Sequence, residues 1–412
     1  MVFSASTYEK FVSEKPLSQT CLFPEYLESN YDFDAIIISS GSGGGVLADD
    51  LAERIGKRKR ILVLEAGSFL YPTHIYHMVE KFKQSSLSDD FIIKQTPRAL
   101  HQPYLNSTGA PNTAFFTEPT GVFNTAELLI HQVDLASKER NHDGPGWHLL
   151  LNKFVENVEQ INDGHAKYRV DTTDTIDGKF RSFRAKTVVL CGGSIESPKF
   201  LRRSSVYGKL PGTIAPLIGR GLTDHPTTHE VTSFVSHMDD LEIPLHAHAK
   251  MILYSEGNKT DDGQIRYLFN VEINVNHEYW HLRENEPSDP GIHPVKGDSR
   301  IDFKFGFGDP VDDGNTMILS ADNYVPNLQF KIKGFGTGAV HHAGCSLRMP
   351  FRQKHDGVFQ NKSIADEDLQ VRGSDGLYVC DMSVMPFSSA ANPVMTLVAS
   401  SLRLSKRLAR RV

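Results

Sequence analysis

The chain has 412 residues, of which 39% are hydrophobic and 23% charged, a balance typical of a soluble globular protein and unlike that of a disordered or fibrous one. Its net charge of −6 gives no electrostatic reason to expect a nucleic-acid partner. The four cysteines are scattered without a CxxC pair, which argues against a zinc site and a disulfide framework, so we expect no bound metal.

The N-terminal part of the chain carries no sign of a membrane or secretory segment. No run of the sequence reaches the roughly 18 apolar residues that a membrane-spanning helix needs. Residues 1–22 lack the apolar core of a signal peptide, and residues 1–30 are expected to form a surface arm. We therefore expect a cytoplasmic protein with no membrane span.

The first strong pattern is a strand, a glycine-rich turn and a helix. Residues 33–38 form a largely aliphatic run suited to a buried parallel strand, and 39–45 read SSGSGGG. Helical spacing follows at 46–54, and a second apolar run occupies 61–64. This order predicts a βαβ unit that binds a dinucleotide.

The chemistry of such a unit points to four residues. Glycines allow the backbone to approach a pyrophosphate, the helix N-terminus favours its negative charge, and an acid after the second strand accepts from a ribose hydroxyl. The candidates are Gly41, Gly43, Gly44 and Glu65, and the acid lies 21 positions beyond the last glycine. The alternative is a glycine-rich loop that serves only tight packing.

Ser39 is a departure from the dinucleotide-binding pattern, because it stands where the first glycine belongs. If this position needs a positive φ, serine there costs roughly 1–3 kcal/mol. A distorted turn is then expected.

Five further elements are predicted in the first half of the chain. A helix is expected at 124–136, and a hairpin at 167–170 and 180–185. A buried strand at 186–191 leads through two glycines to a helix at 195–203. This second strand–glycine–helix passage predicts a return to the nucleotide-binding sheet, with an ordinary strand-to-helix turn as the alternative.

The later part of the chain first shows alternating polar and apolar residues, and its last part again predicts a strand and a helix. Alternating runs at 264–271 and 300–305 predict an antiparallel sheet with one polar face, which we interpret as a substrate-facing lobe. A strand is expected at 376–380 and a terminal helix at 393–408. Basic residues near its end are interpreted as stabilising the negative end of the helix dipole; they are Lys406, Arg407, Arg410 and Arg411.

Six motifs follow one another in the order seen in glucose-methanol-choline (GMC) oxidoreductases, which are FAD enzymes that oxidise alcohols. The chain resembles that family at both ends and in the middle, and its two C-terminal motifs are the more specific. The motifs are GSGGGVLA from Gly41, LEAG from Leu64, CGGSIESP from Cys191, IGRGLTDHP from Ile218, HHAG from His341 and VCDMSVMPFSSAANPVMT from Val379.

The resemblance implies an α/β fold, in which a Rossmann-like FAD-binding domain carries an inserted antiparallel-sheet substrate lobe. The glycine–serine segment that covers the flavin in the family is not recognisable here, so a shortened member is expected. The expected parts are an arm at 1–30, the first part of the FAD-binding domain at 31–235, the substrate lobe at 236–335 and the C-terminal part of the FAD-binding domain at 336–412.

The resemblance also assigns roles to two polar residues. His341 stands where the family has its active-site histidine, and Asn392 where it has a second polar residue. Oxidation of an alcohol needs a proton acceptor near neutral pH, which an imidazole provides, and an amide can orient the hydroxyl. The alternatives are a buried structural histidine, His342 as the base, and Asn392 as a helix cap alone.

The remaining candidates are implied to contact FAD. The glycines and Glu65 would bind the ADP half, Asp381 would lie against the flavin, and the start of the terminal helix would stabilise negative charge on the reduced flavin. We read Asn392 and Pro393 as the N-cap and first residue of that helix. The full set of cofactor candidates is Gly41, Gly43, Gly44, Glu65, Asp381, Pro393 and Val394.

Two hypotheses for the function remain open at this point. In the first, the chain is an FAD-dependent oxidoreductase that takes hydride from a CH–OH group of an alcohol or sugar-like substrate and passes electrons to oxygen or another acceptor. In the second, it is a degraded relative that binds a nucleotide or a partner without turnover. Retention of His341 and Asn392 favours the first; Ser39 and the missing flavin cover favour the second.

Overall fold

The structure is a computed structural model, which describes the chain in segments. They are residues 32–55, 58–67, 125, 128–129, 132, 146–224, 232–237, 249–254, 269–275, 298–307, 313–319, 326–329, 342–350, 362–389, 391 and 393–411. The predicted arm at 1–30 and most of the predicted helix at 124–136 lie outside these segments.

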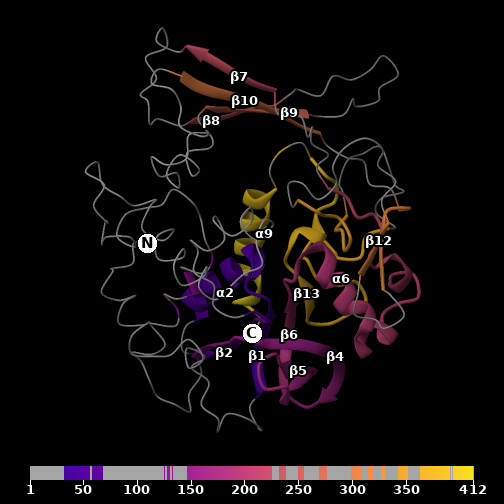
Figure 1. The fold of residues 1–412 in the computed structure, drawn as a ribbon. Helices are drawn as coiled ribbons and strands as arrows, with labels where there is room; N and C mark the ends of the chain where they lie inside the picture. The colour runs from indigo at the N-terminus through magenta and orange to yellow at the C-terminus, as the bar shows by residue number, and fades with distance from the viewer. Residues whose placement is uncertain are drawn as a thin grey trace.

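A seven-stranded mixed sheet forms the centre of the fold (Figure 1). Its parallel part runs in the order β3-β2-β1-β6, with β13 pairing β6 in parallel, and β5 and β4 extend it antiparallel. The strands are β1 (Asp32–Ile38), β2 (Arg60–Leu64), β3 (Gly146–Leu150), β4 (Lys153–Asp163), β5 (Ala166–Asp174), β6 (Phe180–Leu190) and β13 (Leu377–Val379).

The second strand of the predicted hairpin, at 180–185, and the predicted buried strand at 186–191 form one continuous strand, β6. Its first half pairs antiparallel with β5, and its second half pairs parallel with β1 and β13. The return to the nucleotide-binding sheet is therefore confirmed, while the division of β6 at position 185/186 was wrong. No glycine or proline interrupts the strand there, so the chain continues straight from one pairing to the other.

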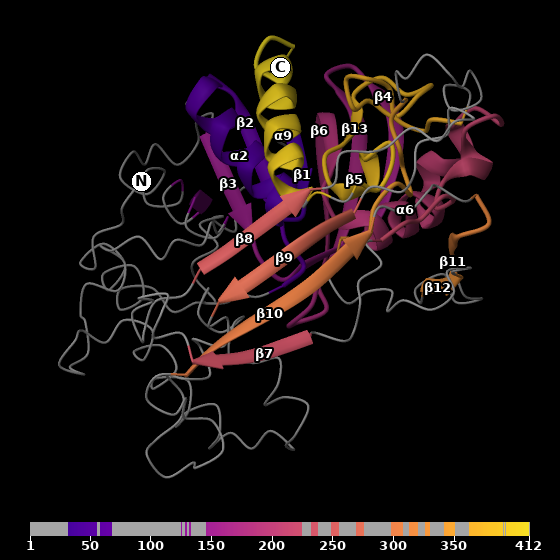
Figure 2. The same cartoon turned by 90° about the horizontal axis from the view of Figure 1, so that it is seen from above.

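Two helices from opposite ends of the sequence lie side by side in this domain. They are α2 (Ser42–Ile55) and α9 (Val394–Leu408), seen in indigo and yellow in both views (Figures 1 and 2). The helix α6 (Gly193–Arg203) follows β6, as predicted. The α9 side chains that face the core recur at helical spacing; they are Leu397, Ser400, Ser401, Leu404, Ser405 and Leu408.

A second, four-stranded antiparallel sheet has the order β7-β10-β9-β8. In Figure 1 it lies beyond the N-terminal end of α9. Its strands are β7 (Thr232–His237), β8 (Ala249–Tyr254), β9 (Phe269–Val275) and β10 (Asp298–Phe307), and a separate hairpin joins β11 (Thr316–Leu319) and β12 (Pro326–Gln329).

The second sheet also includes a strand that the sequence analysis did not single out. This strand is β8, on which Met251 and Leu253 are 56% and 51% exposed. The expected lobe boundary at 235/236 lies within β7. The α/β class and the combination of a parallel core with an antiparallel sheet are confirmed. No described helix is long and apolar enough to cross a membrane.

The glycine-rich turn after β1 contains the strain that the sequence predicted. Ser39 has φ 83°, in the left-handed region that disfavours a side chain. Its N–H donates to the carbonyl of Leu64 over 2.7 Å, so the turn still connects to β2. Serine is thus accommodated in the turn at a cost in backbone strain.

We predict that Ser39→Gly stabilises the folded protein by about 1 kcal/mol, because glycine adopts a positive φ without strain but loses more entropy on folding. The midpoint of thermal unfolding should rise. The neighbouring Ser40→Gly is the control: its hydroxyl donates to Glu65 over 2.7 Å, so its loss should lower the midpoint. A fall in the midpoint with Ser39→Gly would contradict the inference that Ser39 is strained.

A second prediction concerns His148 on β3, whose pKa is lowered to about 4 by burial and by the charge of Arg60. Between pH 6.5, the ordinary pKa of histidine, and about pH 4, the unfolded chain binds a proton that the folded chain does not. Stability should therefore fall as the pH falls through this window, by up to about 3 kcal/mol from this group.

The measurement is the denaturation midpoint of the protein and of His148→Gln at several pH values between 7 and about 4. The variant should lose less stability on acidification than the original protein. Equal losses in the two proteins would show that His148 does not contribute.

Candidate active site

The carboxyl ends of four parallel strands meet at one edge of the main sheet. The glycine turn follows β1, Glu65 follows β2, Cys191 and Gly193 follow β6, and Asp381 lies just beyond β13. Crevices outside the carboxyl ends of parallel strands are where open α/β sheets bind ligands. The topology thus brings predicted residues from three distant segments to one edge.

The three candidate glycines meet different surroundings. A Cβ atom on Gly43 would overlap the carbonyl oxygen of Cys380, and one on Gly44 would overlap that of Ser39. Among the described residues, none has a heavy atom within 4 Å of such a Cβ position on Gly41. Packing, the alternative explanation, therefore accounts for Gly43 and Gly44, while Gly41 borders open space that a phosphate group can approach.

Glu65 ties the end of β2 to the glycine turn. Its carboxylate accepts hydrogen bonds from the N–H and hydroxyl of Ser40, over 2.8 and 2.7 Å, and from the N–H of Gly67 over 2.8 Å. A carboxylate has about four acceptor positions, so these three contacts leave capacity for a ribose hydroxyl. The geometry fits the adenosine part of a dinucleotide.

Asp381 is a buried anchor between the C-terminal segment and α6. Its carboxylate accepts from the N–H of Gly193 over 2.9 Å, the hydroxyl of Ser197 over 2.5 Å and the N–H of Ser383 over 2.8 Å. Burial raises its pKa, and these hydrogen bonds oppose the rise. With 3% exposure it has little surface for a ligand, so its predicted contact with the flavin stays a prediction.

His341 and Asn392 both lie outside the described residues, so their predicted roles stay predictions. The segment after His341 is described and is held on two sides. Gly344 and Thr223 exchange backbone hydrogen bonds of 2.8 and 3.1 Å, and Ala343 accepts from the hydroxyl of Ser194 on α6 over 2.5 Å.

Asp224 is a positioning residue in the motif from Ile218, to which the sequence analysis assigned no role. It is 1% exposed, and its Oδ1 accepts from the N–H of His342 over 3.1 Å. Its backbone carbonyl accepts from the hydroxyl of Ser388 over 3.2 Å. Asp224 therefore contacts both C-terminal motifs. The only sequence signal that could have identified it is its place as the acid of the motif from Ile218 to Pro226.

A small apolar cluster links the two C-terminal motifs directly. Cys345, Met385 and Leu397 pack together, each at most 6% exposed. The Sγ of Cys345 accepts from the hydroxyl of Thr223 over 3.1 Å. The cluster holds the residue after Gly344 against the first turn of α9.

The helix α9 begins one residue later than predicted. Pro393 is its N-cap and Val394 its first residue, and no side-chain hydrogen bond caps it. Met395 in the first turn is 78% exposed. Because first-turn N–H groups have no partner within the helix, this open end can stabilise negative charge on a bound group. Among the described residues, no cluster could hold a metal ion.

We predict that Gly43→Ala and Gly41→Ala differ in their effect on stability. The added methyl group at position 43 should cost about 1–3 kcal/mol or more, because the backbone of Cys380 must move. The same change at position 41 should cost less than about 1 kcal/mol, since it meets open space next to a helix start. Thermal unfolding of both variants tests this, and equal midpoints would contradict the close contact.

Comparison with known proteins agrees with this architecture. The sequence models of the N-terminal and C-terminal domains of the GMC oxidoreductases match residues 148–227 and 328–401. No curated protein is significantly similar in sequence. Among solved structures, pyridoxine 4-oxidase from Mesorbium loti is similar in fold, with a TM-score of 0.52, 15% identity, and coverage of 91% of this chain and 99% of that one.

The two matched domain models cover residues 148–227 and 328–401, and the similarity to the solved oxidase is one of fold. GMC oxidoreductases generally bind FAD, and the open space at Gly41 and the acceptor capacity of Glu65 fit its adenosine diphosphate half. Both domain models of the GMC oxidoreductases are thus found in this chain, as the resemblance of its motifs implied.

Proposed function

We propose that this protein is an FAD-dependent oxidoreductase that oxidises a CH–OH group of an alcohol or sugar-like substrate. The observation that carries the proposal is the packing of Cys345 against Leu397, because it joins the segment after His341 to the helix after Asn392. A base and an amide brought to one place are what alcohol oxidation requires of the protein.

The proposed cofactor contacts divide between the two ends of the chain. Gly41 and Glu65 bind the pyrophosphate and ribose, and Gly43 and Gly44 keep the turn close to the sheet. At the other end, the N–H groups at the start of α9, after Pro393 and Val394, stabilise negative charge. FAD, when bound, supplies the acceptor for the hydride that leaves the substrate carbon.

The proposed proton transfer uses the C-terminal motifs. His341 takes the proton from the substrate hydroxyl, and Asn392 donates a hydrogen bond to the developing alkoxide. Asp224 contributes by accepting from the N–H of His342, which holds the histidine segment in place. A neutral imidazole is needed for this role, so activity should rise with pH through the pKa of the histidine.

The proposal also covers how the reduced protein is reoxidised and where in the cell it acts. Electrons leave the reduced protein to oxygen or another acceptor, and the protein acts in the cytoplasm. The alternative is a family member that binds a nucleotide or partner without turnover. The φ of 83° at Ser39 favours that alternative, because it shows a departure from the usual glycine within the cofactor turn.

The test is anaerobic reduction of the purified yellow protein by a panel of alcohols and sugars that includes pyridoxine, followed by its visible spectrum. We expect at least one substrate to bleach the flavin. His341→Ala should slow bleaching by about 10²–10⁴-fold, because it removes the base. His342→Ala is the matched control and should retain most of the rate.

The variants must keep the flavin spectrum and the thermal midpoint of the original protein, so that lost rate reports chemistry alone. A loss confined to His342→Ala would reverse the assignment of the base. A yellow protein that no alcohol bleaches would favour binding without turnover, and a colourless protein that refuses added FAD would overturn the proposal.

A further inference from the structure

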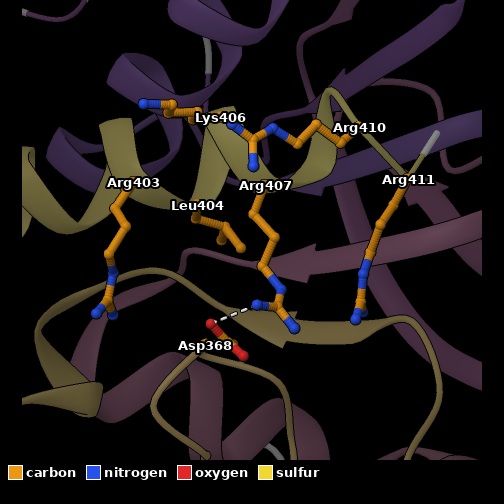
Figure 3. A pocket seen from close by; sticks show the side chains of 7 residues that line it. All are labelled: Asp368, Arg403, Leu404, Lys406, Arg407, Arg410 and Arg411. Atoms are coloured by element: carbon orange, nitrogen blue, oxygen red, sulfur yellow. Dashed lines mark ion pairs between the residues drawn. The ribbon is translucent and has the colours of Figure 1, made fainter.

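A basic pocket lies at the C-terminal end of α9, away from the candidate active site. It has a volume of about 380 Å³. A helix of 15 residues is about 22 Å long, so the pocket and the open N-terminal end of α9 are separated by roughly that length. Its lining residues are Asp368, Arg403, Leu404, Lys406, Arg407, Arg410 and Arg411 (Figure 3).

The charges of this pocket are strongly unbalanced. Five cationic side chains and one carboxylate line it. The negative end of the helix dipole amounts to about half a charge, which accounts for only a small part of the excess. Stabilisation of the helix, the interpretation from the sequence, therefore does not explain why so many cations surround a concave site.

Three arginines are held in fixed positions on one side of α9. Arg403, Arg407 and Arg411 follow one another at intervals of four residues, and Figure 3 shows them projecting in the same direction. Arg403 donates to the carbonyl of Glu367 over 2.7 Å, and Arg411 to the hydroxyl of Tyr378 over 2.9 Å.

Arg407 at the centre retains hydrogen-bonding capacity. Its Nη1 pairs with Asp368 over 2.5 Å, while its Nε is buried with no hydrogen-bond partner among the described residues. A guanidinium group has five N–H donors, so the contacts to protein engage only a minority of them. The arginines are thus ordered by the protein and still able to bind a ligand.

Lys406 and Arg410 add positive charge without an obvious structural purpose. Both are exposed, and neither has an ion-pair partner in the segments that the structure describes. Close cations on one helix repel one another, so their presence beside three arginines costs stability unless an anion is bound.

We propose that this pocket binds a compact ligand with at least two phosphate groups. Guanidinium groups match phosphate oxygens in bidentate pairs, and several ordered arginines can bind a multivalent anion together. A concave site of about 380 Å³ suits a small free ligand. Leu404 also lines the pocket but is buried, so the charged side chains offer the contacts to the ligand.

The test is titration calorimetry with inorganic pyrophosphate at about 0.15 M salt, where exposed charges are largely screened. The full-length protein with FAD present should show one saturable site. Arg410→Gln should weaken binding by about fivefold or more, because it removes a cation without a structural partner. Asp368→Asn should tighten binding, because it removes the carboxylate that competes with phosphate.

Lys179→Gln is the control, since it removes an exposed cation in the turn between β5 and β6 that does not line the pocket, and it should leave affinity unchanged. Vesicles of phosphatidylcholine with phosphatidylserine form a second arm of the test. Binding to these vesicles without saturable binding of pyrophosphate would overturn the proposal, as would equal weakening by Lys179→Gln and Arg410→Gln.

Discussion

The close approach of Gly43 to the backbone of Cys380 is the contact on which the rest of the structure depends. A side chain at position 43 would overlap that carbonyl, so α2 and β13 reach this distance only with glycine there. The approach lets α9 pack beside α2, and Cys380 contacts Ser401 of α9 over 3.2 Å. The beginning and end of the sequence consequently share one hydrophobic core.

Two buried carboxylates fix the position of segments in the candidate active site. Asp381 accepts two hydrogen bonds from α6 and one from Ser383 in its own segment, and Asp224 accepts from the backbone of His342. A buried acid is tolerable only when donors offset its desolvation, so each one requires its partners to stay in place. The segments that contain Asp381 and His342 are thereby held in place by buried carboxylates that need not touch a substrate.

Much of the fold could be predicted because its signals are local. The apolar runs of β1 and β2 and the helical spacing of α9 depend only on neighbouring residues. The continuity of β6 could not be predicted in the same way, because its two halves pair with different partners.

The sequence by itself determined the βαβ unit, the order of the family motifs and the identity of the candidate site residues, because glycine spacing and periodicity are properties of the chain alone. Only the tertiary structure decided which of these residues border open space, which serve packing and which anchor other segments. It separates Gly41, which borders open space, from Gly43, which serves packing, and it makes Asp381 an anchor. The physical reason is that each of these roles depends on atoms from distant segments, which meet only after folding.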